Sequence, residues 1–124
     1  MFLERPQSEW VAENAQAFAI RDPYPVSPGH TLVITRRLVP TWFDATPDEQ
    51  AALLDLVRDV KAALDRSHAP DGYNVGLNAG AAAGQTVMHV HVHVIPRYTG
   101  DMPDPRGGVR GVIPGKQKYG EGAR

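Results

Sequence analysis

The sequence predicts an α+β domain in which one main helix packs on an antiparallel sheet of about five strands. Its 124 residues are enough for one hydrophobic core but too few for two. A single segment has a helical apolar period with a signal at each end, and about five strand-like segments surround it, mostly joined by short turns.

The first three strands are expected before the helix. Residues 10–13 and 17–20 are separated by Asn14-Ala15-Gln16, which suits a hairpin. The next strand is expected over residues 30–35, because this stretch is rich in β-branched residues and follows the turn-forming Ser27-Pro28-Gly29.

The main helix is expected over residues 47–66. Thr46 suits the N-cap, Pro47 suits the first helical position, and Glu49 completes a capping box. Pro70 ends the helical pattern. Apolar residues recur at steps of three and four and form one face that packs on the sheet. They are Leu53, Leu56, Val57, Val60 and Leu64.

Two more strands are expected after the helix. Residues 72–78 predict a weak strand, because this stretch contains glycines. Residues 88–95 alternate strictly between two kinds of side chain and end at Pro96. The alternation would place the valines of this strand in the core and its histidines on the opposite, solvent-facing side.

Three of the five histidines lie within five residues, at His89, His91 and His93. A lone histidine on such a strand would simply fill the wet face. Threonine, lysine or glutamate would serve there equally well, so three alternating histidines indicate a functional site.

Two kinds of chemistry fit these histidines. Two of them could bind zinc with help from His30 or a carboxylate. His89 and His93 have Cα atoms about 13 Å apart at the usual strand rise, so all three cannot bind one ion. The other chemistry is covalent catalysis, because neutral imidazole is abundant and nucleophilic at pH 7. His91 has a partner on each side and is the better candidate nucleophile.

Composition excludes several other classes of protein. Thirteen Lys and Arg against 14 Asp and Glu give a net charge of −1, which argues against binding to nucleic acid or to an anionic membrane. The absence of cysteine excludes disulfides, thiolate catalysis and Cys-based zinc sites. No apolar run is long enough to span a membrane, and residues 1–10 lack a signal-peptide pattern, so we expect a cytoplasmic protein.

A stretch of small residues, Gly80–Thr86, runs directly into the histidine segment. Its glycines would let backbone N–H groups approach an anion, while Gln85 and Thr86 add neutral donors. This stretch favours a phosphate-binding loop over a plain turn.

Two of these segments resemble the histidine triad (HIT) proteins. Residues 84–97 are similar to the family signature and residues 22–34 to its upstream segment, and the resemblance covers roughly residues 10–101. It implies a HIT-like fold for a single domain over residues 1–100, followed by a tail over residues 101–124. It also implies a homodimer that acts on a small nucleotide with no cofactor and no obligatory metal.

The resemblance implies a role for each candidate residue. His91 would attack the α-phosphorus of a nucleoside phosphoanhydride or phosphoramidate and form a nucleotidyl-histidine, which water then hydrolyses. His89 and His93 would position the phosphate and assist the leaving group, His30 would lie near the nucleophile, and Asp22 would bind ribose hydroxyls. The retained third histidine favours the hydrolase branches of the family. The residues implied near the phosphates are Asn78, Gly84, Gln85 and Thr86, and those beside the base are Ile20 and Leu32, which could equally be core.

Two other functions stay open at this point: a nucleotide-binding sensor with little turnover, and a His-ligated metal protein. The tail also stays open in conformation, because ten of the 23 Gly and Pro residues fall within residues 100–124. We expect an arm, a loop or a disordered end, in which Val112-Ile113 could dock on the body. For Arg106 and Arg110 the sequence favours a solvated tail over contact with a polyphosphate.

Overall fold

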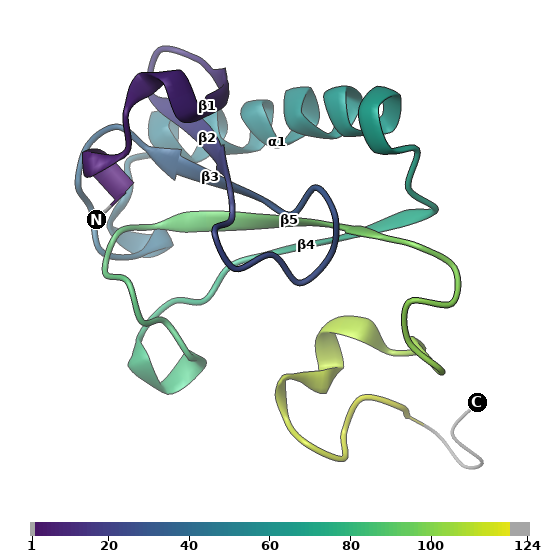
Figure 1. Ribbon diagram of the computed structural model, residues 1–124. Coiled ribbons are helices and arrows are strands. Elements are labelled where there is room, and N and C mark those ends of the chain that lie inside the picture. Colours follow the sequence, from purple (N-terminus) through teal and green to yellow (C-terminus); the bar gives the residue numbers. More distant parts are fainter. Residues whose placement is uncertain (1, 120–124) are drawn as a thin grey trace.

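The computed structural model describes residues 2–119, which form one antiparallel sheet crossed by one long helix (Figure 1). The strands are β1 (Trp10–Glu13), β2 (Ala17–Arg21), β3 (Thr31–Thr35), β4 (Gly72–Gly76) and β5 (His91–Arg97), in the order β1-β2-β3-β5-β4. The helix α1 spans Pro47–His68. The α+β class and the helix-on-sheet arrangement predicted from the sequence are confirmed.

Short 3₁₀ helices occupy several connections of the described chain. They are η1 (Phe2–Glu4), η2 (Gln7–Glu9), η3 (Trp42–Asp44), η4 (Ala81–Ala83) and η5 (Gly108–Val112). Within residues 2–119, no helix combines the length and the apolar character that a membrane span requires.

Helix α1 begins as predicted and ends two residues later than predicted. Thr46 accepts a hydrogen bond from the N–H of Glu49, whose carboxylate accepts one from the N–H of Thr46, so the capping box is complete. The helix continues past residue 66 to His68, and its C-cap Ala69 adopts a left-handed conformation with φ 45°.

Strand β5 is displaced from the predicted range of residues 88–95. It begins at His91 and runs through Pro96 to Arg97. Proline fits here because the neighbouring β3 ends its pairing with Thr31 opposite Val94, so the missing N–H of Pro96 faces no strand partner on that side. The first residues of the predicted strand, among them His89, therefore lie outside the ladder.

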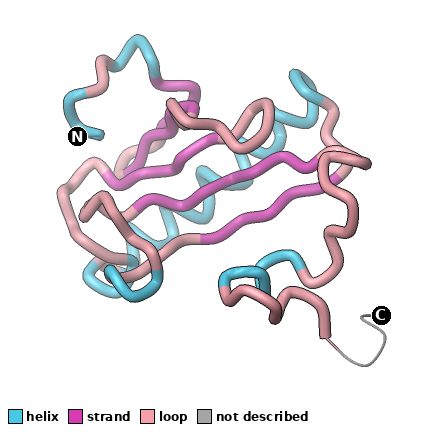
Figure 2. Tube along the Cα trace, turned by 60° about the horizontal axis from the view of Figure 1, so that its bottom comes forward, coloured by secondary structure: helices cyan, strands magenta, loops and turns pink. Residues whose placement is uncertain are grey.

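The two faces of the sheet carry different clusters of apolar side chains. The main core lies between the sheet and α1, which lies behind the strands in Figure 2. It includes Val90, Val92 and Val94, so the predicted inward direction of these valines is confirmed. On the opposite face lies a smaller cluster of Phe2, Phe18, Ile20, Leu32 and Ile34.

The described part of the tail, residues 101–119, forms an arm with no secondary structure longer than η5, as its Gly and Pro content predicts. Val112 and Ile113 are 74% and 58% exposed, so the predicted docking of this pair is wrong. Polar contacts hold the arm instead. The side chain of Gln117 donates to the carbonyl groups of Asp104 and Arg106 and closes the segment between them into a loop.

Thr46→Ala should lower the free energy of unfolding by about 1 kcal/mol, because it removes the cap of the only long helix among residues 2–119. Urea unfolding followed by circular dichroism measures this. Thr99→Ala, on an exposed loop, is the control and should stay within about 0.5 kcal/mol of wild type. Equal losses in the two variants would contradict the assigned role of the cap.

Candidate active site

The central histidine of the triad is held in one tautomer by the backbone. Nδ1 of His91 lies 2.8 Å from the carbonyl oxygen of His89, which can only accept, so the ring carries its proton on Nδ1 and donates it. The lone pair of His91 therefore sits on Nε2. A half-buried imidazole with a fixed, unprotonated Nε2 is a suitable nucleophile.

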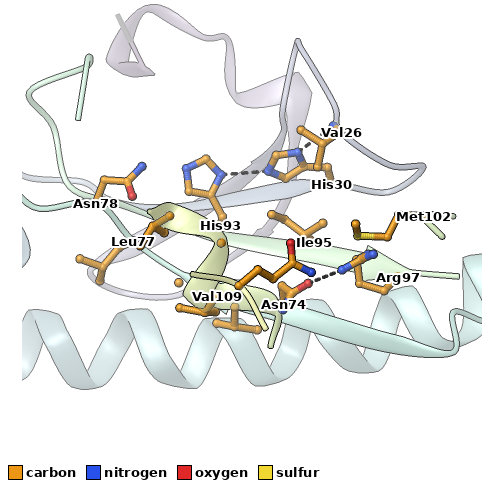
Figure 3. Close-up of a pocket in the computed structure, with 16 residues that line it drawn as sticks. Val26, His30, Asn74, Leu77, Asn78, His93, Ile95, Arg97, Met102 and Val109 are labelled. Atoms are coloured by element: carbon orange, nitrogen blue, oxygen red, sulfur yellow. Dashed lines mark hydrogen bonds between the residues drawn. The ribbon is translucent and has the colours of Figure 1, made fainter. Parts of the chain in front are cut away.

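His30 and His93 form a second, linked arrangement (Figure 3). The N–H of Val26 donates to Nδ1 of His30 at 3.1 Å, so the proton of neutral His30 lies on Nε2. That Nε2 is 2.9 Å from Nδ1 of His93, to which it donates. The His93 proton is then on Nε2, on a ring that packs edge-on against His91 with ring centroids 5.2 Å apart.

The environment keeps these neighbouring imidazoles neutral. The pKa of His93 is lowered to about 4, mainly by burial and partly by the nearby His91 and His30, while the carboxylate of Asp22 acts in the opposite direction. Burial also lowers the pKa of His30, although the carboxylate of Asp22 opposes this effect. At pH 7 His93 and His30 are therefore donors of N–H hydrogen bonds without a positive charge.

His89 lies on a different side of the nucleophile and is the most enclosed residue of the triad, with 2% of its surface exposed. Its Nε2 is 2.8 Å from the carbonyl oxygen of Thr35, and burial is the main cause that lowers its pKa. The predicted solvent-facing position is therefore wrong for His89. The face of the sheet that carries the histidines is thus covered at His89, where the sequence pattern predicted exposure to solvent.

The covering group is Phe2, which the sequence analysis did not identify. Its ring centroid lies 4.9 Å from that of His91 in an edge-on contact and 5.7 Å from that of His89. It is only 6% exposed although it is the second residue of the chain. One aromatic residue near an end carries no periodic signal, and only a three-dimensional structure brings it to the histidines.

Ile20 and Leu32 lie directly opposite each other on β2 and β3 and pack in the same cluster as Phe2. They are 2% and 3% exposed. These two residues thus belong to an apolar cluster that borders the histidines and is closed by Phe2. This position fits both alternatives, a place in the core and a place beside the base.

Asp22 lies at the end of β2, beside His30. Its Oδ2 is 3.4 Å from Nε2 of His30, and its Oδ1 accepts the N–H of Tyr24 at 2.8 Å. Within residues 2–119, one oxygen of this carboxylate is thus engaged in the loop while the other faces the imidazoles. This position next to the histidine cluster is compatible with the ribose contact that the resemblance implies.

Asp22, His30 and His93 also form a group whose ligand atoms all lie within 4.8 Å of one another, which is chemically suited to a transition metal. Metal binding at Nε2 of His30 would require its proton to move to Nδ1. Nδ1 already accepts the N–H of Val26, so two N–H groups would then face each other. The hydrogen-bond pattern therefore disfavours a metal at this cluster.

The small-residue loop is shaped by its glycines and held by Gln85. Gly80 and Gly84 have φ values of 94° and 95°, which residues other than glycine rarely adopt. Gln85 is 5% exposed; its Oε1 accepts the N–H of Gly80, and its Nε2 donates to the carbonyl groups of Pro40 and Val87. Both of its N–H donors are used, so Gln85 positions the loop and has no donor left for a phosphate.

Asn78 and Thr86 have exposed side chains, and no hydrogen bond of these side chains is present within residues 2–119. Asn78 lines a groove together with His30 and His93, and Figure 3 shows the three side chains around the same space. The structure therefore brings Asn78, His30 and His93 together.

A comparison with known families matches the HIT domain to residues 4–100, and the chain belongs to this family. The bis(5'-nucleosyl)-tetraphosphatase of Schizosaccharomyces pombe is 44% identical over 80 residues, which are 64% of this chain and 44% of that protein. The AP-4-A phosphorylase of Mycobacterium tuberculosis is 38% identical over 92 residues, which are 73% of this chain and 47% of that protein. The chain thus spans about half the length of these two relatives.

The fold is also similar to solved structures. A hypothetical histidine triad nucleotide-binding protein from Sulfolobus tokodaii matches with a TM-score of 0.71 and 40% identity, over 77% of this chain and 64% of that chain. The HIT fold predicted from the resemblance is therefore confirmed.

The neutral, buried His93 should make the protein lose stability as the pH falls below about 6.5. In that range the unfolded chain binds a proton at His93, while the folded chain does not until the pH reaches about 4. The free energy of unfolding of His93→Gln should therefore fall less between pH 6.5 and pH 4.5 than that of wild type, as measured by urea unfolding.

His68→Gln, at the end of α1, is the control and should retain the wild-type slope. The range above pH 4.5 avoids the buried carboxylate of Glu49, whose pKa its ion pair with Arg37 lowers to about 2. An unchanged slope in His93→Gln would show that His93 is not held neutral.

Proposed function

We propose that this chain is a nucleotide hydrolase that attacks the α-phosphorus of its substrate through Nε2 of His91. One observation carries the proposal above the others: the hydrogen bond from Nδ1 of His91 to the carbonyl oxygen of His89, which leaves Nε2 unprotonated. The names of the two curated relatives, a tetraphosphatase and a phosphorylase, support a substrate with a phosphoanhydride chain.

The proposed reaction has two displacements. In the first, the Nε2 lone pair of His91 forms a bond to the α-phosphorus while the bond from phosphorus to the leaving oxygen breaks, and that oxygen keeps the electron pair. In the second, water attacks the same phosphorus, the nitrogen–phosphorus bond breaks, His91 recovers its lone pair, and the water proton passes to solvent. The N–H of His93 would stabilise charge on the phosphate oxygens. The N–H groups of Gly80, Ala83, Gly84 and Gln85 donate within the loop, so only the remaining N–H groups of residues 80–86 could add to this stabilisation.

The neutral state of His93 favours a leaving group that departs as an anion. A nucleoside polyphosphate does so at pH 7 and needs no proton from the protein, whereas the amine of a phosphoramidate does need one. His93, with a pKa of about 4, donates a hydrogen bond more readily than a proton. We therefore place a dinucleoside polyphosphate first among the substrates and a phosphoramidate second.

We also propose that two copies of the chain associate through β4. Within residues 2–119, this strand pairs only with β5 and leaves its other edge open. Val75 on this strand is 44% exposed. An open edge with an exposed apolar side chain is suited to pairing with a second, two-fold related copy.

His91→Ala should lower kcat/KM for diadenosine tetraphosphate by at least about a thousandfold, because no other group supplies the covalent step. Rapid quenching followed by mass spectrometry should detect an adenylyl adduct on wild type and none on the variant. His68→Ala, at the end of α1, is the control and should behave as wild type.

Product analysis identifies the acceptor of the second step. AMP and ATP indicate water, whereas ADP that forms only with added phosphate indicates phosphorolysis, the activity for which the M. tuberculosis relative is named. Unchanged turnover in His91→Ala would contradict the proposal, and tight nucleotide binding without turnover by wild type would indicate a sensor.

Val75→Lys should shift the protein from dimer to monomer, because it places like charges at the two-fold pairing of β4. Light scattering coupled to size-exclusion chromatography measures the mass against 13.5 kDa for one chain. Val11→Lys on β1, the other edge strand, starts from a similar exposure of 43% and should stay dimeric. A wild-type mass of one chain at micromolar concentration would refute the dimer.

A further inference from the structure

A groove of about 550 Å³ extends from the catalytic histidines along β5 and β4, and the C-terminal arm forms its outer wall. Its inner end is lined by His30 and His93, and Figure 3 shows Ile95 and Asn74 further along its floor with Val109 of the arm over them. Ile95 lies four residues beyond His91, which is about 13 Å at the usual rise of a strand. The groove thus begins at the proposed reaction centre and leads away from it.

The groove runs from His30 and His93 toward β4, away from the Phe2 cluster, and Asp22 lies beside His30 at its inner end. In the sheet, β2 and β3 lie on one side of β5 and carry Ile20 and Leu32, while β4 lies on the other side and carries Asn74. A substrate whose first nucleoside occupies the β2–β3 side therefore leaves the groove on the β4 side free for the group beyond its α-phosphorus.

The walls of the groove are apolar, with neutral amides between them. Leu77, Ile95, Met102, Val109 and Val112 supply the apolar surface, and Asn74, Asn78 and Gln117 supply amides. Arg97 also lines the groove, but its guanidinium donates to both oxygens of Asp101 and to Oδ1 of Asn74. Its charge is thus neutralised by an ion pair at the start of the arm.

The arginines of the arm are also engaged. Arg106 donates to Asp104 in an ion pair of 2.8 Å, and Asp104 also binds Lys118 at 2.8 Å. Arg110 lies over the ring of Tyr119 at 4.9 Å. Arg106 is thus paired within the arm, and the groove beyond His93 presents a neutral surface.

Hydrogen bonds within the arm hold its conformation at the side of the groove. Gln117 closes the loop between residues 104 and 117, and a Cβ atom on Gly107 would overlap the carbonyl oxygen of Gln117. A Cβ atom on Gly108 would lie 3.3 Å from Nδ2 of Asn74, so the arm also approaches β4 closely. Glycine at position 107 thus allows the arm to close on itself, and Gly108 lies at the close approach between the arm and the sheet.

From these features we infer that the groove between the arm and strands β4 and β5 binds the nucleoside of the leaving group. This inference rests on the proposed function and specifies its substrate class as a dinucleoside polyphosphate. A nucleoside is uncharged, presents a flat apolar face and forms hydrogen bonds with amides, which matches the walls of the groove. A sulfate, an amine or a terminal phosphate would leave most of the volume empty and would meet no unpaired cation among the lining residues.

The test compares two substrates with the same adenylyl group: diadenosine tetraphosphate, which has a leaving nucleoside, and adenosine 5'-phosphoramidate, which has none. The variant is Val109→Asp, a wall residue that is 64% exposed, so the substitution leaves the core intact. Its control is Ile113→Asp, which adds the same charge to the same arm at a position that is 58% exposed and outside the groove.

We expect Val109→Asp to lower the ratio of kcat/KM for the dinucleoside to that for the phosphoramidate by at least about tenfold relative to Ile113→Asp, because the charge repels the polyphosphate and removes an apolar contact. An equal loss on both substrates, or no change in the ratio, would overturn the inference.

A binding experiment separates this inference from the proposed reaction. Non-hydrolysable, methylene-bridged analogues of diadenosine tetraphosphate and of adenosine tetraphosphate differ in the second nucleoside, and calorimetry measures both affinities. Wild type and Ile113→Asp should bind the dinucleoside analogue at least about tenfold more tightly, and Val109→Asp should lose this difference. Wild type with that difference but without turnover would refute the hydrolase and retain the groove; wild type with equal affinities would refute the groove.

Discussion

The hydrogen bond from the N–H of Val26 to Nδ1 of His30 determines where the protons lie in this site. Because a backbone N–H can only donate, neutral His30 carries its proton on Nε2. His93 accepts the hydrogen bond of this N–H at its Nδ1. The same bond opposes a metal ion at His30. The composition of the cluster of Asp22, His30 and His93 permits a metal site as well as hydrogen bonding to a phosphate. The backbone N–H of Val26, a loop residue outside the histidine motif, favours the second of these.

A second constraint acts on the nucleophile from within its own segment. The chain leaves the sheet just before His91, and this turns the carbonyl group of His89 toward Nδ1 of His91. A regular strand over residues 88–95 would direct that carbonyl toward a neighbouring strand. The departure from the predicted strand is thus part of the arrangement that fixes the lone pair on Nε2.

Sequence patterns predicted what depends on short-range periodicity. The capping box at Thr46, the apolar face of α1 and the alternation through β5 each follow from a few consecutive residues, and each appears in the structure. The position of Phe2 over the histidines and the approach of the arm to β4 escaped prediction for a physical reason, since each depends on contacts with residues distant in the chain. Gln85 was predicted to donate to a phosphate because its side chain is a neutral amide. In the structure this amide is buried and bonds to backbone groups instead.

The charges of the tail show why composition alone misjudges the far side of the site. Arginines close to a phosphate-processing cluster suggest electrostatic capture of a long anion, yet Arg97 and Arg106 pair with Asp101 and Asp104. Paired charges shape the chain without adding a net attraction at distance. What they shape is a wall with a neutral, apolar inner surface, so in the proposed reaction the leaving group would be selected on this side by fit and burial, while the imidazoles would act on the phosphate itself.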